Sequence, residues 1–217
     1  MISEAYLWIW LPGASEPVVC GKLQRDNDIY SFVYGRSYLK RGNAIALEPR
    51  DLPLEEGVFT PMLGETHSVI RDAAPDAWGR RVLIYRSGGR NLTELDYLLR
   101  AGSDRIGALD VMLEPTDYPA SQAEQQATLE DLLLASERLE TGQAIPQSLG
   151  NALLHGSSVG GARPKALLND GHSKWIAKFS STTDYYPVVK SEYATMCLAS
   201  QCSIEVPAIK LVKILGK

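Results

Sequence analysis

The pattern of apolar and polar positions divides the chain into three parts. In the first part, two short runs at residues 5–11 and 29–34 are rich in aromatic and β-branched residues, and proline, glycine and Asp/Asn positions separate them. This arrangement is typical of short strands joined by turns. The pattern therefore predicts a small β-rich subdomain over residues 1–60.

The second part has apolar positions at helical spacing. Apolar positions recur at helical spacing in two segments, so that each segment would present one apolar face of a helix. The leucines are Leu92, Leu95, Leu98 and Leu99 in the first, and Leu129, Leu132, Leu133 and Leu139 in the second. Asn91 or Thr93 can cap the first of these helices. We therefore expect a mainly helical subdomain over residues 61–145.

The third part, residues 146–217, changes character again. Two runs of alternating apolar residues are joined by Asn-Asp-Gly at 169–171, which is a strong signal for a β-hairpin. A helical pattern follows Pro187, and the apolar segment 206–215 reads as a further strand. The predicted order is strand, strand, helix, strand.

Composition and charge exclude several classes of protein. The 217 residues carry a formal net charge of −4, so the chain lacks the basic footprint of a nucleic-acid-binding domain. The apolar run at 6–11 is too short, and lacks the preceding basic residues, for a signal peptide. No stretch approaches the roughly 20 apolar residues of a membrane helix. Three cysteines without zinc spacing indicate reduced thiols, and we expect a soluble cytoplasmic protein without a membrane partner.

A Gly-rich segment at 156–161 is the first candidate for chemistry. Glycines can take the backbone angles that turn successive N–H groups inward toward an anion. The spacing fits neither the phosphate loop G-x-x-x-x-G-K-[ST] nor the dinucleotide fingerprint, because Lys165 lies four residues after Gly161. The segment is therefore either a phosphate-binding loop or a plain turn.

Lys178 and Glu192 favour the phosphate-binding loop over the plain turn. Strand alternation places Lys178 on the same face as Ile176, and a lysine on an inner strand needs an anion because a buried ammonium is costly. On an exposed strand it would need none. Glu192 lies 14 residues later, near the start of the predicted helix. A Gly-rich loop, a strand lysine and a helix glutamate follow one another in the same order in a protein-kinase N-lobe.

Several stretches of the sequence resemble the HipA-like toxin kinases, the serine/threonine kinases of bacterial type II toxin–antitoxin systems. The resemblance spans most of residues 60–217 and implies an α+β chain that ends in an incomplete kinase-like N-lobe of antiparallel strands and one helix. The stretches that carry it are "PDAWGRR" at 75–81, "DRIGAL" at 104–109, "SSVGGARPKALL" at 157–168, "WIAKF" at 175–179 and "SEYATMCLASQCSIEVP" at 191–207.

The resemblance also implies roles for individual residues. Lys178 would anchor the phosphates of ATP, and Glu192 would hold the lysine, so that both are catalytic. Ser158 matches a loop serine whose autophosphorylation pulls the loop out of its ATP-bound position and switches the kinase off. Pro164 departs from the family pattern and removes one backbone donor. The implied ATP-binding residues are Ser157, Ser158, Val159, Gly160, Gly161, Ala162, Arg163, Lys165 and Lys178.

The catalytic half of a kinase is missing from the sequence. A kinase takes its catalytic aspartate and its Mg²⁺ ligands from the C-lobe, and no aspartate follows Asp184. We therefore assign no metal ligand to this chain and expect the Mg²⁺ ligands to come from the missing C-lobe. We interpret the chain as the N-terminal portion of a kinase, inactive alone, although a truncated product or one half of a split system fits the same pattern.

The family suggests partners and a function. The whole kinase would transfer phosphate from ATP to a serine or threonine of a protein, with aminoacyl-tRNA synthetases as family targets, and would arrest growth. Its partners would be a helix-turn-helix antitoxin and the protein substrate, and DNA would be reached only through the antitoxin. Two alternatives stay open: a non-catalytic docking or regulatory module that binds an antitoxin or a separate kinase core, and a regulator that binds ATP without hydrolysing it.

Other polar residues are given structural roles. In the "PDAWGRR" stretch, Trp78 is expected to be a packing anchor, and Asp76, Arg80 and Arg81 to hold the helical subdomain together. The histidines at 67, 155 and 172 have no partner at triad or metal spacing, and we assign them no function.

Overall fold

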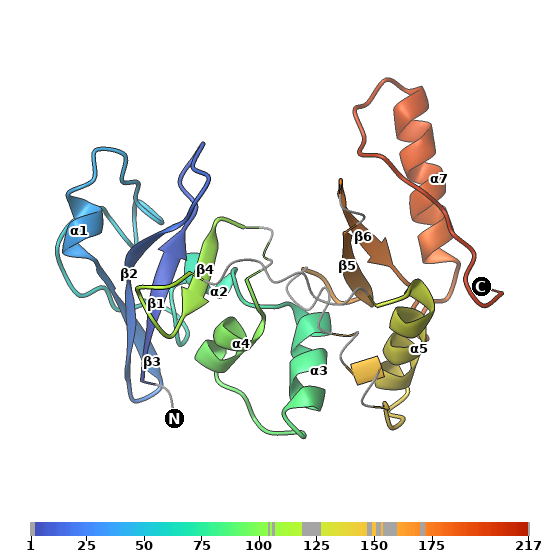
Figure 1. Cartoon of the computed structure of the whole chain (residues 1–217), viewed down its shortest axis with the longest axis horizontal. Helices are drawn as coiled ribbons and strands as arrows, with labels where there is room; N and C mark the ends of the chain where they lie inside the picture. The colour runs from blue at the N-terminus through green and yellow to red at the C-terminus, as the bar shows by residue number, and fades with distance from the viewer. Residues whose placement is uncertain are drawn as a thin grey trace.

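The computed structural model confirms an α+β fold (Figure 1). It describes residues 3–103, 105, 107–118, 127–146, 149–150, 153, 160–169 and 172–216. Within these residues there are two antiparallel sheets and six helices. None of the described helices is long and apolar enough to cross a membrane.

The larger sheet has four antiparallel strands in the order β3-β2-β1-β4. Three of them lie in residues 1–60, the predicted β-rich subdomain. The short strand β4 lies in residues 61–145, which were predicted to be mainly helical. β4 pairs with β1 so that Leu7 lies opposite Val111. The strands are β1 (Glu4–Ile9), β2 (Val18–Asp26), β3 (Ile29–Tyr34) and β4 (Leu109–Met112).

Two tyrosines organise the core beside this sheet. The buried hydroxyl of Tyr34 donates a hydrogen bond to the carbonyl of Leu52 at 2.8 Å and accepts one from the amide of Leu47 at 2.9 Å. Tyr38, from the short helix α1 (Arg36–Leu39), stacks on Tyr34 with ring centroids 5.9 Å apart. These bonds satisfy the polar ends of rings whose apolar bodies fill the core.

Three helices follow in the chain: α2 (Ser68–Arg71), α3 (Ala77–Arg86) and α4 (Glu94–Arg100). Thr93 is the N-cap of α4, as the sequence indicated, and exchanges hydrogen bonds with Asp96 in a capping box. The guanidinium of Arg80 donates one hydrogen bond to each carboxylate oxygen of Glu94, both at 2.7 Å. This two-bond contact fixes α3 against α4.

Arg105 joins strand β4, helix α4 and the connection before α3. Its Nε lies 2.7 Å from a carboxylate oxygen of Asp110, and its two terminal nitrogens donate to the carbonyls of Ala73 and Leu98. The side chains of Arg105 and Asp110 are only 4% and 3% exposed. The hydroxyl of Tyr118 donates to the other oxygen of Asp110 at 2.8 Å. The buried charges are therefore paired and hydrogen-bonded, which burial requires.

The second sheet is the predicted hairpin. Strands β5 (Lys165–Asn169) and β6 (Lys174–Lys178) pair antiparallel, and Ala166 and Phe179 pack against the helix α5 (Leu129–Glu140). The helix α7 (Val188–Gln201) follows and has no buried residue. Figure 1 shows α3 between the four-stranded sheet and this hairpin.

The prediction of a strand at 206–215 is wrong. No strand is assigned there, because a strand needs a neighbour for its backbone hydrogen bonds and, in the described part of the chain, β5 and β6 pair only with each other. The segment instead leads from the end of α7 back toward α5 (Figure 1), where Ile214 packs on the hydrophobic cluster of α5 and the hairpin.

Replacing Arg105 by methionine should lower the free energy of unfolding by about 3–5 kcal/mol, because the buried Asp110 carboxylate loses its charge partner. Urea unfolding followed by circular dichroism measures this loss. The control is Arg100→Met, since Arg100 forms an exposed pair with Asp96 at 4.0 Å and its loss should cost less than about 1 kcal/mol. Equal losses in the two variants would contradict the assignment.

Candidate functional site

The strand lysine and the helix glutamate lie together. Lys178 is the last residue of β6, and Glu192 lies in the second turn of α7. Their side chains form an ion pair. The pairing of these two residues is therefore present in the structure, whereas their catalytic roles stay predictions.

The ion pair lies on the solvent side of the hairpin. Lys178 and Ile176 are on the exposed face of β6, and Trp175 and Ala177 are half-buried on the other. The side chains of Lys178 and Glu192 are 48% and 45% exposed. Of the two alternatives for Lys178, the structure supports the exposed strand. This two-stranded sheet leaves Lys178 open, and Lys178 could reach an anion from solvent.

Part of the predicted ATP loop is described. Gly160, Gly161, Ala162, Arg163 and Lys165 lie in the structure, and Gly161 has φ +114°, a backbone angle that favours glycine. The ammonium of Lys165 donates to the carbonyl of Gly160, and Arg163 pairs with Asp184. Ser157, Val159 and the proposed autophosphorylation residue Ser158 lie outside the described residues.

Two lysines face each other beside this loop. Lys165 of β5 is the register partner of Lys178 of β6. Burial lowers the pKa of Lys165, and the positive charge of Lys178 lowers it further, while the carboxylates of Asp76 and Glu192 act in the opposite direction. Like charges opposite each other on neighbouring strands are unfavourable. An added anion would relieve this repulsion.

The N-terminal end of α3 contacts the loop, which the sequence analysis missed. Trp78 is a buried packing anchor, as expected, in a cluster with Ala135 and Ile145. Its indole N–H also donates to the carbonyl of Lys165 at 3.2 Å. Arg81 donates to the carbonyl of Ala162 at 2.7 Å. Trp78 and Arg81 therefore join α3 to the Gly-rich loop, and Trp78 also packs in the helical region. These contacts cross more than 80 positions of the chain, and no local sequence pattern predicts them.

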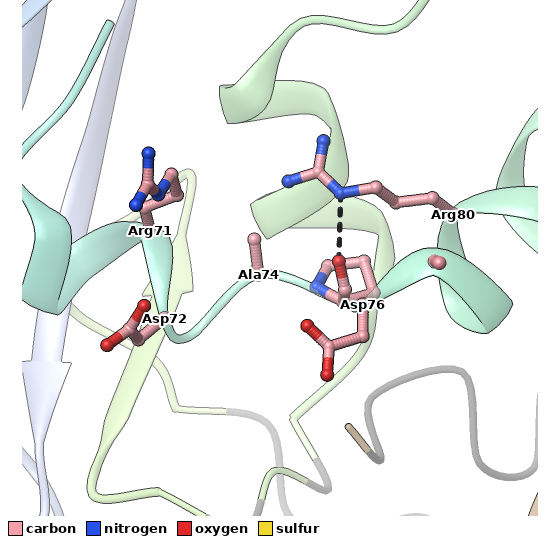
Figure 2. Close-up of a pocket in the computed structure, with 7 residues that line it drawn as sticks. Arg71, Asp72, Ala74, Asp76 and Arg80 are labelled. Carbon is pink, nitrogen blue, oxygen red and sulfur yellow. Dashed lines mark hydrogen bonds between the residues drawn. The ribbon is translucent and has the colours of Figure 1, made fainter. Parts of the chain in front are cut away.

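Two shallow hollows meet at Asp76. One, of about 560 Å³, is shown in Figure 2, where the guanidinium of Arg80 donates to the carbonyl of Pro75 at 2.9 Å. The other, of about 300 Å³, lies between Arg105, Gly107 and Gly160. Across the described residues, no group of three or more His, Cys, Asp or Glu side chains is placed to hold a metal ion.

Comparison with known families gives two matches. The HipA N-terminal domain matches residues 10–112, which include most of the four-stranded sheet and helices α1 to α4. The HipA-like C-terminal domain matches residues 157–217, which include the Gly-rich loop, the hairpin and α7. A search of curated proteins gave no match. The two matches follow each other in the chain and meet where α3 contacts the loop, and the chain is therefore a HipA-like protein, of a family of kinase-like proteins of toxin–antitoxin systems.

Proposed function

We propose that this chain is the ATP-binding portion of a toxin–antitoxin serine/threonine protein kinase. The observation that carries the proposal is the ion pair between Lys178 and Glu192, formed between the hairpin and the helix that follows it. In protein kinases a pair of this kind places the lysine on the nucleotide phosphates. A docking module would have no use for it beside a Gly-rich loop.

The residues fit a nucleotide. Lys165 and Lys178 bring two positive charges to neighbouring strands. Glu192 pairs with one of them, and a triphosphate would supply further negative charge. Gly161 lets the backbone approach a ligand closely. Bound ATP would supply the phosphoryl group for transfer. We assign the Mg²⁺ ligands and the catalytic aspartate to a C-lobe, in the same or a separate chain, because protein kinases take them from that lobe.

Glu192 would hold the ammonium of Lys178 in position. An ammonium has three N–H donors, and the bond to Glu192 uses one of them. The remaining donors of Lys178 can bind phosphate oxygens. Because both side chains are about half exposed, a nucleotide could reach Lys178 without opening a core.

The wider function follows from the family. The kinase would phosphorylate a serine or threonine of a protein target, with aminoacyl-tRNA synthetases as the class to test first, and a helix-turn-helix antitoxin would be its partner. Autophosphorylation at Ser158 would switch it off.

Lys178→Ala should weaken ATP binding by at least about 10-fold, because a charge-assisted bond to a phosphate oxygen is lost. Isothermal titration of ATP into the purified chain measures the affinity. The matched control is Lys174→Ala, which removes an equal charge from the same face of β6. Wild-type affinity in the Lys178 variant, or an equal loss in the control, would contradict the phosphate-anchor role and favour the non-catalytic module.

Neither Lys178→Ala nor Glu192→Ala should change the free energy of unfolding by more than about 1 kcal/mol, because exposed ion pairs contribute little to stability. Thermal and urea unfolding of both variants test this. A loss of several kcal/mol would show that the pair supports the fold, and a change in ATP binding could then not be assigned to the phosphates.

A further inference from the structure

The N-terminal end of α3, from its N-cap Asp76 to Arg81, holds the backbone of the Gly-rich loop through four hydrogen bonds. Each of them joins positions more than 80 residues apart. The carboxylate of Asp76 accepts from the amide of Gly161, the amide of Trp78 donates to the carbonyl of Gly161 at 3.3 Å, the indole of Trp78 donates to the carbonyl of Lys165 at 3.2 Å, and Arg81 donates to the carbonyl of Ala162 at 2.7 Å.

The carboxylate of Asp76 binds the loop and does not cap its own helix. It stands at the N-cap of α3 in an extended conformation, yet its side chain makes no capping hydrogen bond. An aspartate at this position ordinarily stabilises its own helix by accepting from the first-turn amides. Here the carboxylate binds Gly161, and a side chain added at Gly160 would place its Cβ only 2.9 Å from that carboxylate. The contact therefore requires a glycine at position 160.

Trp78 and Arg81 differ in how firmly they are held. Trp78 is 1% exposed and packs with Ala135 and Ile145, so it presents its two N–H donors from a rigid core. Arg81 is exposed, and its guanidinium lies over the ring of Trp78, 5.3 Å from the centroid. The ring thus orients the arginine toward the carbonyl of Ala162.

We propose that this N-terminal end of α3 is the positioning element of the nucleotide site, with Trp78 and Arg81 as positioning residues. The proposal goes beyond the proposed function and rests on it. An anion site must present N–H groups, because a carbonyl oxygen repels a phosphate. Carbonyls that are bonded to α3 cannot also face a phosphate, so these contacts select a loop conformation in which the carbonyls of Gly161, Ala162 and Lys165 are turned away from a bound anion.

The same contact couples the two matched domains. Trp78 and Arg81 lie within the HipA N-terminal domain, and the loop lies within the HipA-like C-terminal domain. A partner that shifts α3 would therefore change nucleotide affinity without touching the nucleotide.

Arg81 gives the cleanest test, because it is exposed and its loss leaves the core intact. Arg81→Ala, Arg81→Gln and the charge-matched control Arg86→Ala, on the same helix, are compared. Hydrogen–deuterium exchange of peptides covering residues 160–168 reports the loop, and titration with ATP reports affinity. Arg81→Ala should speed exchange several-fold and weaken ATP binding about 3- to 10-fold. Arg81→Gln, which keeps a donor without the charge, should recover part of both losses, and Arg86→Ala should change neither.

Unchanged exchange in Arg81→Ala would overturn the proposal. So would a loss of affinity that is equal in the alanine and glutamine variants with unchanged exchange, since Arg81 would then act by charge alone. Faster exchange with undiminished ATP affinity would also overturn it. If the wild-type chain does not bind ATP, the proposed function fails, and with it the nucleotide role, whereas exchange still decides whether α3 holds the loop.

Discussion

Trp78 bonds the helix α3 to the Gly-rich loop, and the proposed nucleotide site depends on this contact. The indole is buried among residues of α5 and the segment after it, and its N–H donates to the carbonyl of Lys165, while the backbone amide of Trp78 donates to the carbonyl of Gly161. The ring therefore meets three requirements at once: it fills a core, it satisfies the carbonyl of Lys165, and it supports the guanidinium of Arg81. A smaller apolar residue could meet only the first.

The position of Trp78 is itself set by buried and half-buried arginines. Arg80 fixes α3 against α4 through Glu94, and Arg105 binds the connection before α3, the end of α4 and strand β4. Multidentate arginine contacts hold geometry well because the planar fork matches its acceptors. A continuous set of contacts thus leads from the four-stranded sheet to the loop, and from the loop through β5 to the pair of Lys178 and Glu192.

The sequence predicted the features that depend on near neighbours. The strand at 29–34, the hairpin across 169–171 and the Thr93 cap arise from alternation, turn chemistry and capping. The pairing of Lys178 with Glu192 followed from the order of a loop, a strand and a helix. Features that depend on distant partners were not predictable. The segment 206–215 has a strand pattern without a strand to pair with, and the bonds from α3 to the loop cross more than 80 residues.

The exposure of Lys178 shows that the alternation of residues along a strand does not predict which face of the strand is buried. Alternation says which residues share a face, and it placed Lys178 with Ile176 correctly. Which face is covered depends on what packs against the sheet. Here α5 covers the face of Ala166 and leaves Lys178 exposed, while Lys165 is half-buried.

The central claim is that Lys178 meets the phosphates of ATP, and covalent labelling tests it most directly. An acyl-phosphate derivative of ATP transfers its acyl group to lysines beside the phosphates, and mass spectrometry locates the modified residue. The account predicts labelling of Lys178, with Lys165 as the second position, and protection of both by excess ATP. Labelling that excess ATP does not suppress, or protected labelling confined to a distant lysine such as Lys22 or Lys40, would contradict it.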